Sequence, residues 1–178
     1  MKLTLKRNKK DFLLVVLSVL LFPYLFSGSV YRPFIKPFTG PSPVLDSVTE
    51  QIILTESSKL QVPYDIALFL ALAESGGDPI AEKRPRGSRG IDQGLYQINS
   101  RWLGDFSWRY NNGKKIDPFS VMCSTRVALR YLKSLYGYFG TWYQALEAYN
   151  AGPRAVEDGD VTDSTKHYAE WIINGGFP

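Results

Sequence analysis

Residues 63–77 read PYDIALFLALAESGG, and this stretch decides the fold class of the chain. Eight consecutive apolar residues, 66–73, are too many for a helix with one exposed face, so they predict a helix that is buried nearly all round. Pro63 is favoured at the start of a helix, and the pair Gly76-Gly77 is typical of a helix end. The stretch therefore predicts a helix of the core.

Glu74 is the first ionisable residue after this apolar run. It follows Leu70 by four residues and Ile66 by eight, so it lies on their face of the helix. A carboxyl at the edge of a core loses hydration and faces the negative end of the helix dipole, and both effects favour its neutral form. We therefore expect a raised pKa for Glu74, the property of a general acid. The alternative is a Glu at a fraying helix end that reaches water and has no role.

Apolar positions at helical spacing predict further helices. One begins after residue 44, with Leu45, Val48, Ile52 and Leu60 near one face. Others are expected over 120–138, 141–149 and 163–173, with Asp163 or Ser164 as the cap of the last. Residues 76–118 have no helical period, and the run 95–98 suggests a short strand within them. The fold class is therefore mainly α, with a long irregular loop region between helices.

The first 43 residues differ from the rest of the chain. Five of the 21 basic residues but one of the 17 acidic residues lie in the first eleven, and an uncharged, largely apolar stretch covers 12–31. This order predicts that residues 1–31 are a signal peptide or an N-terminal membrane anchor. Four prolines in 32–43 predict an extended linker, or an arm packed on the domain. The folded domain is expected over 44–178, outside the cytoplasm.

The composition excludes several classes of function. Beyond the leader, 16 basic and 16 acidic residues remain, so the pI near 9.1 does not support nucleic-acid binding. A single cysteine, Cys123, allows no intrachain disulfide, and a single histidine, His167, leaves no Cys/His zinc site. No nucleophile motif points to His167, which disfavours hydrolases of the Ser-His-Asp type.

Three short motifs follow one another: ESG at 74–76, GLYQIN at 94–99 and AYNAGP at 148–153. An aromatic residue, Tyr168, falls in the last expected helix. In this order they resemble the catalytic domain of the soluble lytic transglycosylases over roughly residues 50–175. The resemblance implies a lysozyme-like fold and an enzyme that cleaves the glycan strands of bacterial peptidoglycan.

The sequence departs from the commonest family pattern just before Gly94, where it has Asp92 and Gln93. This variant is more similar to transglycosylases associated with secretion and conjugation machinery, and to the animal c-type lysozymes. Tyr96 also stands where Met or Leu is usual. The basic loop 83–89 could touch acidic wall polymer or a partner, or be simply solvated.

The resemblance also implies roles for the motif residues. Glu74 would protonate the oxygen leaving N-acetylmuramic acid (MurNAc) and then, once ionised, accept the proton of the C6 hydroxyl, which closes a 1,6-anhydro ring without water. Asp92 would be an auxiliary charge stabiliser; a turn residue, or a nucleophile in a hydrolase, are the alternatives. The residues expected to bind substrate or orient Glu74 are Ser75, Gln97, Tyr149, Asn150 and Tyr168. Trp102 and Trp108 would either stack on sugar rings or be buried under the loop.

The expected function is that of a lytic transglycosylase of the bacterial envelope that cleaves the bond between MurNAc and N-acetylglucosamine (GlcNAc). It would need no metal or organic cofactor. Its expected partners are peptidoglycan strands, the membrane through the N-terminal segment, and an envelope-spanning machine, with no nucleic acid. The alternatives are a hydrolytic muramidase that uses Glu74 and Asp92, and a non-catalytic wall-binding component.

Overall fold

A computed structural model describes residues 45–84 and 90–176 of the 178-residue chain. The expected signal or anchor at 1–31, the linker at 32–43 and positions 85–89 of the basic loop lie outside the described residues. Within the described ranges, no helix combines the length and the apolar character that spanning a bilayer requires.

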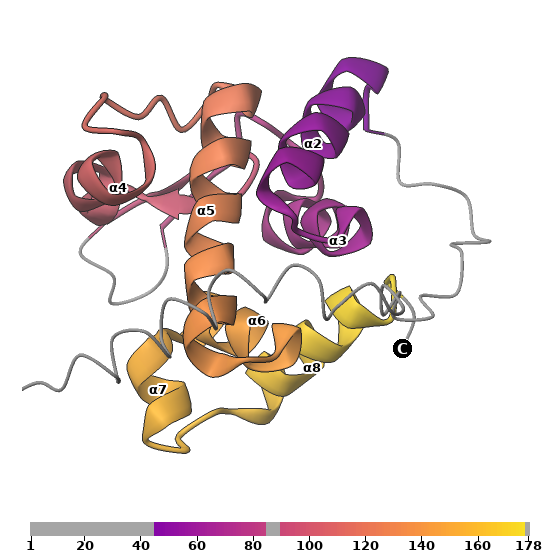
Figure 1. Ribbon diagram of the computed structural model, residues 1–178, viewed down its shortest axis with the longest axis vertical. Coiled ribbons are helices and arrows are strands. Elements are labelled where there is room, and N and C mark those ends of the chain that lie inside the picture. The colour runs from indigo at the N-terminus through magenta and orange to yellow at the C-terminus, as the bar shows by residue number, and fades with distance from the viewer. Residues whose placement is uncertain (1–44, 85–89, 177–178) are drawn as a thin grey trace, which may run out of the picture. The chain divides into compact units, whose positions relative to one another are not determined.

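Most of the described chain is helical (Figure 1). The helices are α2 (Ser47–Leu60), α3 (Tyr64–Ser75), α4 (Leu103–Tyr110), α5 (Val121–Phe139), α6 (Trp142–Ala151), α7 (Pro153–Glu157) and α8 (Asp163–Ile173), with one 3-10 turn, η1 (Ser100–Trp102). Three two-residue strands, β1 (Glu82–Lys83), β2 (Asp92–Gln93) and β3 (Ile98–Asn99), form an antiparallel sheet in that order. The expected mainly α class with an irregular region between helices is confirmed.

The long helix α5 lies in the middle of the domain (Figure 1). In that view α2 and α3 lie to one side of it, α4 to the other, and α6, α7 and α8 below. Its side chains Val127, Leu129 and Leu132 are fully buried and pack in the same core as Leu70 of α3 and Leu146 of α6. The core therefore joins the helices on both sides of the region 76–118, and this positions the loop between them.

The end of α3 agrees with the prediction. Pro63 immediately precedes the helix, and Gly76 ends it in a left-handed conformation (φ 67°) with its N–H donated to the carbonyl oxygen of Leu72. A left-handed residue is favourable only for glycine and a few polar types, which explains the stop at this point. Glu74 consequently stands in the last turn of α3, at the margin of the core.

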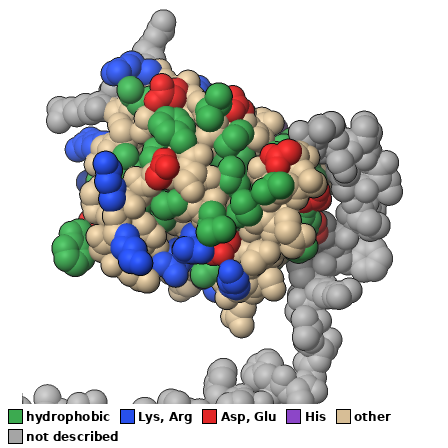
Figure 2. Space-filling view, turned by 90° about the horizontal axis from the view of Figure 1, so that it is seen from above, with side chains coloured by type: hydrophobic (Ala, Val, Ile, Leu, Met, Phe, Trp, Pro, Cys, Tyr) green, Lys and Arg blue, Asp and Glu red, His purple; other side chains and the backbone are tan. Residues whose placement is uncertain are grey.

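The predicted buried face of α2 is partly wrong. Leu45 and Leu60 pack against the core as expected, but Val48 is 66% exposed, while Thr49 and Glu56 are buried. Glu56 is turned inward because Arg126 of α5 donates two hydrogen bonds to its carboxylate, at 2.9 and 3.0 Å. The helix α2 is thus rotated about its axis from the orientation that the spacing of its apolar residues indicates. The surface of the domain carries both apolar and charged side chains (Figure 2).

The region 76–118 differs most from expectation. It contains α4, which was not predicted, and of the strand suggested at 95–98 only Ile98 lies in a strand, β3, because Leu95 to Gln97 form a turn between β2 and β3. Leu95 and Tyr96 are nevertheless fully buried, which explains their strand-like apolar character. The hydroxyl of Tyr96 donates to the carbonyl oxygen of Ala67 at 3.1 Å, so the core accepts a tyrosine there.

Two details at the C-terminal end also differ. The short helix α7 follows α6 directly and was not predicted. The cap of α8 is Thr162, whose hydroxyl accepts from the N–H of Thr165 at 3.3 Å, rather than Asp163 or Ser164, which already lie inside the helix.

Candidate active site

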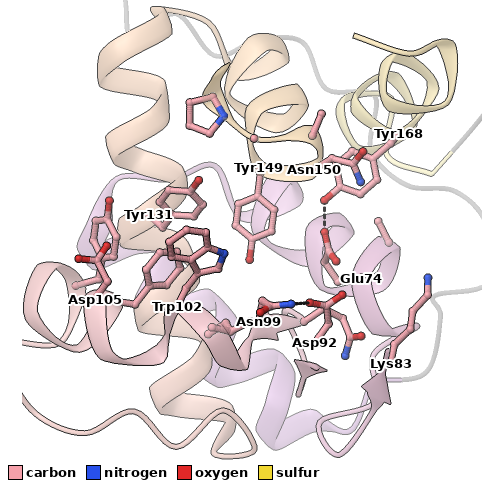
Figure 3. A pocket seen from close by; sticks show the side chains of 18 of the residues that line it. Glu74, Lys83, Asp92, Asn99, Trp102, Asp105, Tyr131, Tyr149, Asn150 and Tyr168 are labelled. Atoms are coloured by element: carbon pink, nitrogen blue, oxygen red, sulfur yellow. Dashed lines mark hydrogen bonds between the residues drawn. The ribbon is translucent and has the colours of Figure 1, made fainter. Parts of the chain in front are cut away.

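A pocket of ≈ 720 Å³ lies between the end of α3, the small sheet, α4, α5, the end of α6 and the middle of α8 (Figure 3). The predicted site residues among those that line it are Glu74, Asp92, Gln97, Tyr149, Asn150 and Tyr168, together with Trp102. Ser75 is not one of its lining residues. The pocket therefore brings together six of the seven predicted site residues.

Glu74 is half-buried in the pocket wall and accepts a hydrogen bond from the hydroxyl of Tyr168 in α8. Burial raises the pKa of Glu74 to about 7, and the charge of Asp92 acts in the same direction. The hydrogen bond from Tyr168 and the positive charge of Lys83 act the other way, because each favours the ionised carboxylate. The raised pKa agrees with the expectation from the apolar run of α3.

Asp92 lies at the middle of a row of three side chains across the sheet. In the strand register Lys83 of β1 is opposite Asp92, and Asp92 is opposite Asn99 of β3. Directly opposed residues of antiparallel strands share one face, and all three line the pocket. Asn99 donates its Nδ2 to Oδ1 of Asp92 at 2.7 Å, and this bond fixes the carboxylate facing Glu74 (Figure 3).

Gln97 and Ser75 donate hydrogen bonds to backbone carbonyl groups. Nε2 of Gln97 donates to the carbonyl oxygens of Gly94 and Ala81, at 2.9 and 3.2 Å. The hydroxyl of Ser75 bonds to the carbonyl oxygen of Leu95 at 2.8 Å and holds the end of α3 against the turn between β2 and β3. Either side chain could donate to a substrate only if one of these bonds were given up.

Tyr149 and Asn150 lie at the end of α6. The hydroxyl of Tyr149 donates to the carbonyl oxygen of Tyr96 at 3.0 Å, and Oδ1 of Asn150 accepts from the hydroxyl of Thr165 at 2.9 Å. The Nδ2 of Asn150 makes no hydrogen bond to another described residue, so within that part of the chain it is a donor available to the pocket. Gly152, rather than Asn150, ends the helix.

An aromatic cluster forms the wall opposite Glu74 and was not predicted from the sequence. It consists of Phe106 and Tyr110 of α4, Tyr131 of α5 and Tyr149, with ring centroids 4.8 to 5.5 Å apart. The signal for it is the spacing of Trp102, Phe106 and Tyr110, four residues apart, which places three aromatic side chains on one face of a helix.

Trp102 and Trp108, the tryptophans of the region 76–118, differ in their positions. Trp102 lines the pocket, is 48% exposed, and has the guanidinium of Arg101 5.2 Å from its ring centroid. Trp108 is 80% exposed and is not a lining residue. Burial under the loop is therefore wrong for both, and Trp102 is the one placed to stack on a ligand in the pocket.

The arrangement can supply a carboxyl that exchanges a proton near neutral pH, a second carboxylate held by an amide, and a ring for stacking. Within the described ranges no group of three or more His, Cys, Asp or Glu could hold a metal ion. A carboxyl that exchanges a proton and a second carboxylate are the groups that acid–base cleavage of a glycosidic bond uses.

Comparison with known proteins agrees with this chemistry. A family model described as the transglycosylase SLT domain matches residues 51–172, a range that includes every residue lining the pocket. A comparison with curated proteins found no match. Proteins of the SLT family have the lysozyme-like, mainly α fold and are lytic transglycosylases that act on peptidoglycan. Because the match covers more than half of the chain, the protein belongs to the SLT-domain lytic transglycosylases, enzymes that act on the peptidoglycan of the bacterial cell wall.

Proposed function

We propose that the enzyme cleaves the MurNAc–GlcNAc bond without water and leaves 1,6-anhydro-MurNAc ends, with Glu74 as general acid and then as general base. The observation that carries the proposal is the position of Glu74, half-buried in the wall of a pocket that Asp92 also lines; burial there raises its pKa to about 7. A group whose pKa lies near the working pH is readily available in both protonation states. The non-hydrolytic route needs one group that serves in both.

In the first step the protonated carboxyl of Glu74 gives its proton to the glycosidic oxygen as the bond from that oxygen to C1 of MurNAc breaks. In the second, the resulting carboxylate accepts the proton of the C6 hydroxyl while the C6 oxygen bonds to C1. The proton lost in the first step is thus recovered in the second, and no water enters. Since Tyr168 holds Oε1, Oε2 is the oxygen that exchanges the proton.

Asp92 would stabilise the positive charge that develops at C1 between these steps. The hydrogen bond from Asn99 supports this role because it keeps the carboxylate in one orientation. Gln97, Tyr149 and Asn150 would bind the glycan, with the Nδ2 of Asn150 reaching an N-acetyl group or a hydroxyl. Ser75, through its bond to Leu95, is better suited to positioning the turn than to binding substrate.

Product analysis tests the proposal. Purified sacculi are digested with the enzyme and the fragments are analysed by mass spectrometry. We expect anhydro-muropeptides without reducing ends; reducing ends would instead identify a muramidase in which Asp92 acts as nucleophile or base.

A comparison of the wild type with Glu74→Gln tests the alternative that the protein is a non-catalytic wall-binding component. Glu74→Gln keeps the size of the side chain and its acceptor for Tyr168 but removes the acid, so it should retain binding to sacculi and release no glycan. Release at the wild-type rate would contradict the assignment of Glu74.

We further propose that the domain 44–178 acts in the extracytoplasmic envelope, with 1–31 as its signal peptide or membrane anchor and 32–43 as its linker. The charge asymmetry of the leader and the family's cell-wall substrate support this placement. The mass of the mature protein distinguishes a removed signal peptide from a retained anchor. Retention in the soluble cytoplasmic fraction would contradict both. The variant at Asp92-Gln93 supports the proposal that the enzyme associates with an envelope-spanning machine. Co-purification from membranes tests this association.

A further inference from the structure

The two cations that line the described pocket are paired differently. Nε of Arg109 lies 2.9 Å from Oδ2 of Asp105, so its charge is compensated by a neighbour on the same helix. Lys83 is exposed, and its ammonium forms no salt bridge or hydrogen bond with another described residue. Within the described chain, Lys83 is therefore the lining cation whose ammonium is available to a ligand.

Lys83 also lies at the catalytic end of the pocket. It is opposite Asp92 in the register of β1 and β2, on the same face of the sheet. Figure 3 shows it on the other side of Glu74 and Asp92 from Trp102 and Asp105. Its charge reaches the reacting group, because it lowers the pKa of Glu74. Oδ1 of Asp92 accepts from Asn99, so that carboxylate is directed along the row rather than held by Lys83.

The substrate brings negative charge to this end. The C1 atom at which the chain is cut belongs to MurNAc, and this sugar carries a lactyl ether on its ring. The ether ends either in a free carboxylate or in a peptide that bears carboxylates. Asp92 lines this end of the pocket and its carboxylate repels an anion, as does that of Glu74 whenever it is ionised. A neighbouring positive charge would offset this repulsion and allow the substrate carboxylate to bind at this end of the pocket.

We propose that Lys83 is a specificity-determining residue that binds a carboxylate of the muramyl substituent, and so favours acidic muramyl glycan over the same glycan with its carboxylates neutralised. This inference rests on the proposed function, since it takes Glu74 as the point of cleavage. A bound carboxylate also compensates the charge of Lys83, so Glu74 holds its proton more firmly when the correct substrate is present.

The test compares the full-chain wild type with Lys83→Ala, Lys83→Glu and Lys83→Arg on three substrates. These are peptide-bearing glycan strands, strands freed of peptide by an amidase so that the lactyl carboxylate is exposed, and the freed strands with that carboxylate converted to a neutral amide. Lys114→Ala is the control, because this exposed lysine does not line the pocket. The first two substrates distinguish peptide carboxylates from the lactyl carboxylate as the source of the anion.

We expect Lys83→Ala to raise KM about three- to tenfold on one or both acidic substrates, the size of a charge-assisted contact at a partly exposed site. Lys83→Glu should raise KM further, and Lys83→Arg should keep the wild-type KM. On the neutral strands the KM of every variant should match that of the wild type.

Activity that falls by the same factor on all three substrates would overturn the proposal. It would indicate that Lys83 acts on the pKa of Glu74 instead. Unchanged KM on every substrate would overturn it as well. A failure of the proposed function is distinct from both, since it would appear as wild-type products that lack anhydro ends.

Discussion

The hydrogen bond between Tyr168 and Glu74 gives the sharpest test of the proposed mechanism. Tyr168→Phe removes the hydroxyl and leaves the ring in place. Because this bond stabilises the ionised carboxylate, its loss should raise the pKa of Glu74 above its present value of about 7. The side chain should therefore remain protonated to higher pH.

The size of the change follows from the kind of bond. A hydrogen bond to a charged group contributes roughly 1.5–3 kcal/mol. One pKa unit corresponds to 1.36 kcal/mol, so the shift should be about 1–2 units upward. The rate at the pH optimum should fall. Without the bond to Tyr168 the carboxylate is less well oriented for its step as a base.

The assay is the pH dependence of kcat/KM for glycan release from sacculi. For a group that acts first as an acid, the alkaline limb reports its pKa in the free enzyme. This limb should move upward by about 1–2 pH units in Tyr168→Phe. Tyr64→Phe is a matched control, because it removes another tyrosine-to-glutamate bond (2.9 Å, to Glu50) between residues that do not line the pocket. An alkaline limb that stays in place, or moves downward, would refute the role of Glu74 as the acid.

Three further predictions concern stability. The folded-state pKa of Glu74 is raised from 4.5 to about 7, so the folded protein should lose stability as the pH rises through this range, by at most about 3 kcal/mol. Glu74→Gln should remove that loss, with a melting temperature above wild type at pH about 8 but not at pH about 4; equal differences at both would contradict it. Arg126→Met removes the two-bond partner of buried Glu56, leaves it only the bond from Lys59, and should cost up to about 3–5 kcal/mol in urea unfolding. Because Arg126, with Lys59, holds the pKa of Glu56 at about 2, the contribution should be complete above pH 4.5 and be lost as the pH falls towards 2, with a smaller pH dependence in Arg126→Met. Gly94→Ala should unfold the domain or cost more than about 3 kcal/mol, since φ is +74° and a Cβ would lie 1.8 Å from a backbone oxygen; Gly104→Ala, with open space around it, should be neutral or stabilising by circular dichroism melts.

The features predicted correctly are those that a single segment determines. The eight apolar residues of α3 specify a buried helix whatever surrounds them, and Gly76 specifies its end. The position and raised pKa of Glu74 follow from these two local facts. The helices α5 and α8 were found for the same reason, since each carries its own period of apolar residues and ends at a glycine or close to one.

The features that were missed depend on pairs distant in sequence. The two-bond partner of the inward-facing Glu56 is Arg126, 70 positions later, and the spacing of apolar residues cannot reveal such a partner. No residue of the helix α4 is fully buried, so Phe106 and Tyr110 resemble loop residues in the sequence, and only the pocket that both line shows their common direction.

The row Lys83–Asp92–Asn99 marks the limit most clearly. Asp92 and Asn99 belong to a motif region of the sequence, but nothing in the sequence links them to Lys83, the first residue of the basic loop. They share a face because β2 pairs with β1 on one side and β3 on the other, and the register of two-residue strands is not encoded by any alternation of apolar and polar residues. The proposed acid, Glu74, can thus be found from its own helix, whereas the charges that would select the substrate become visible only once the strands are paired.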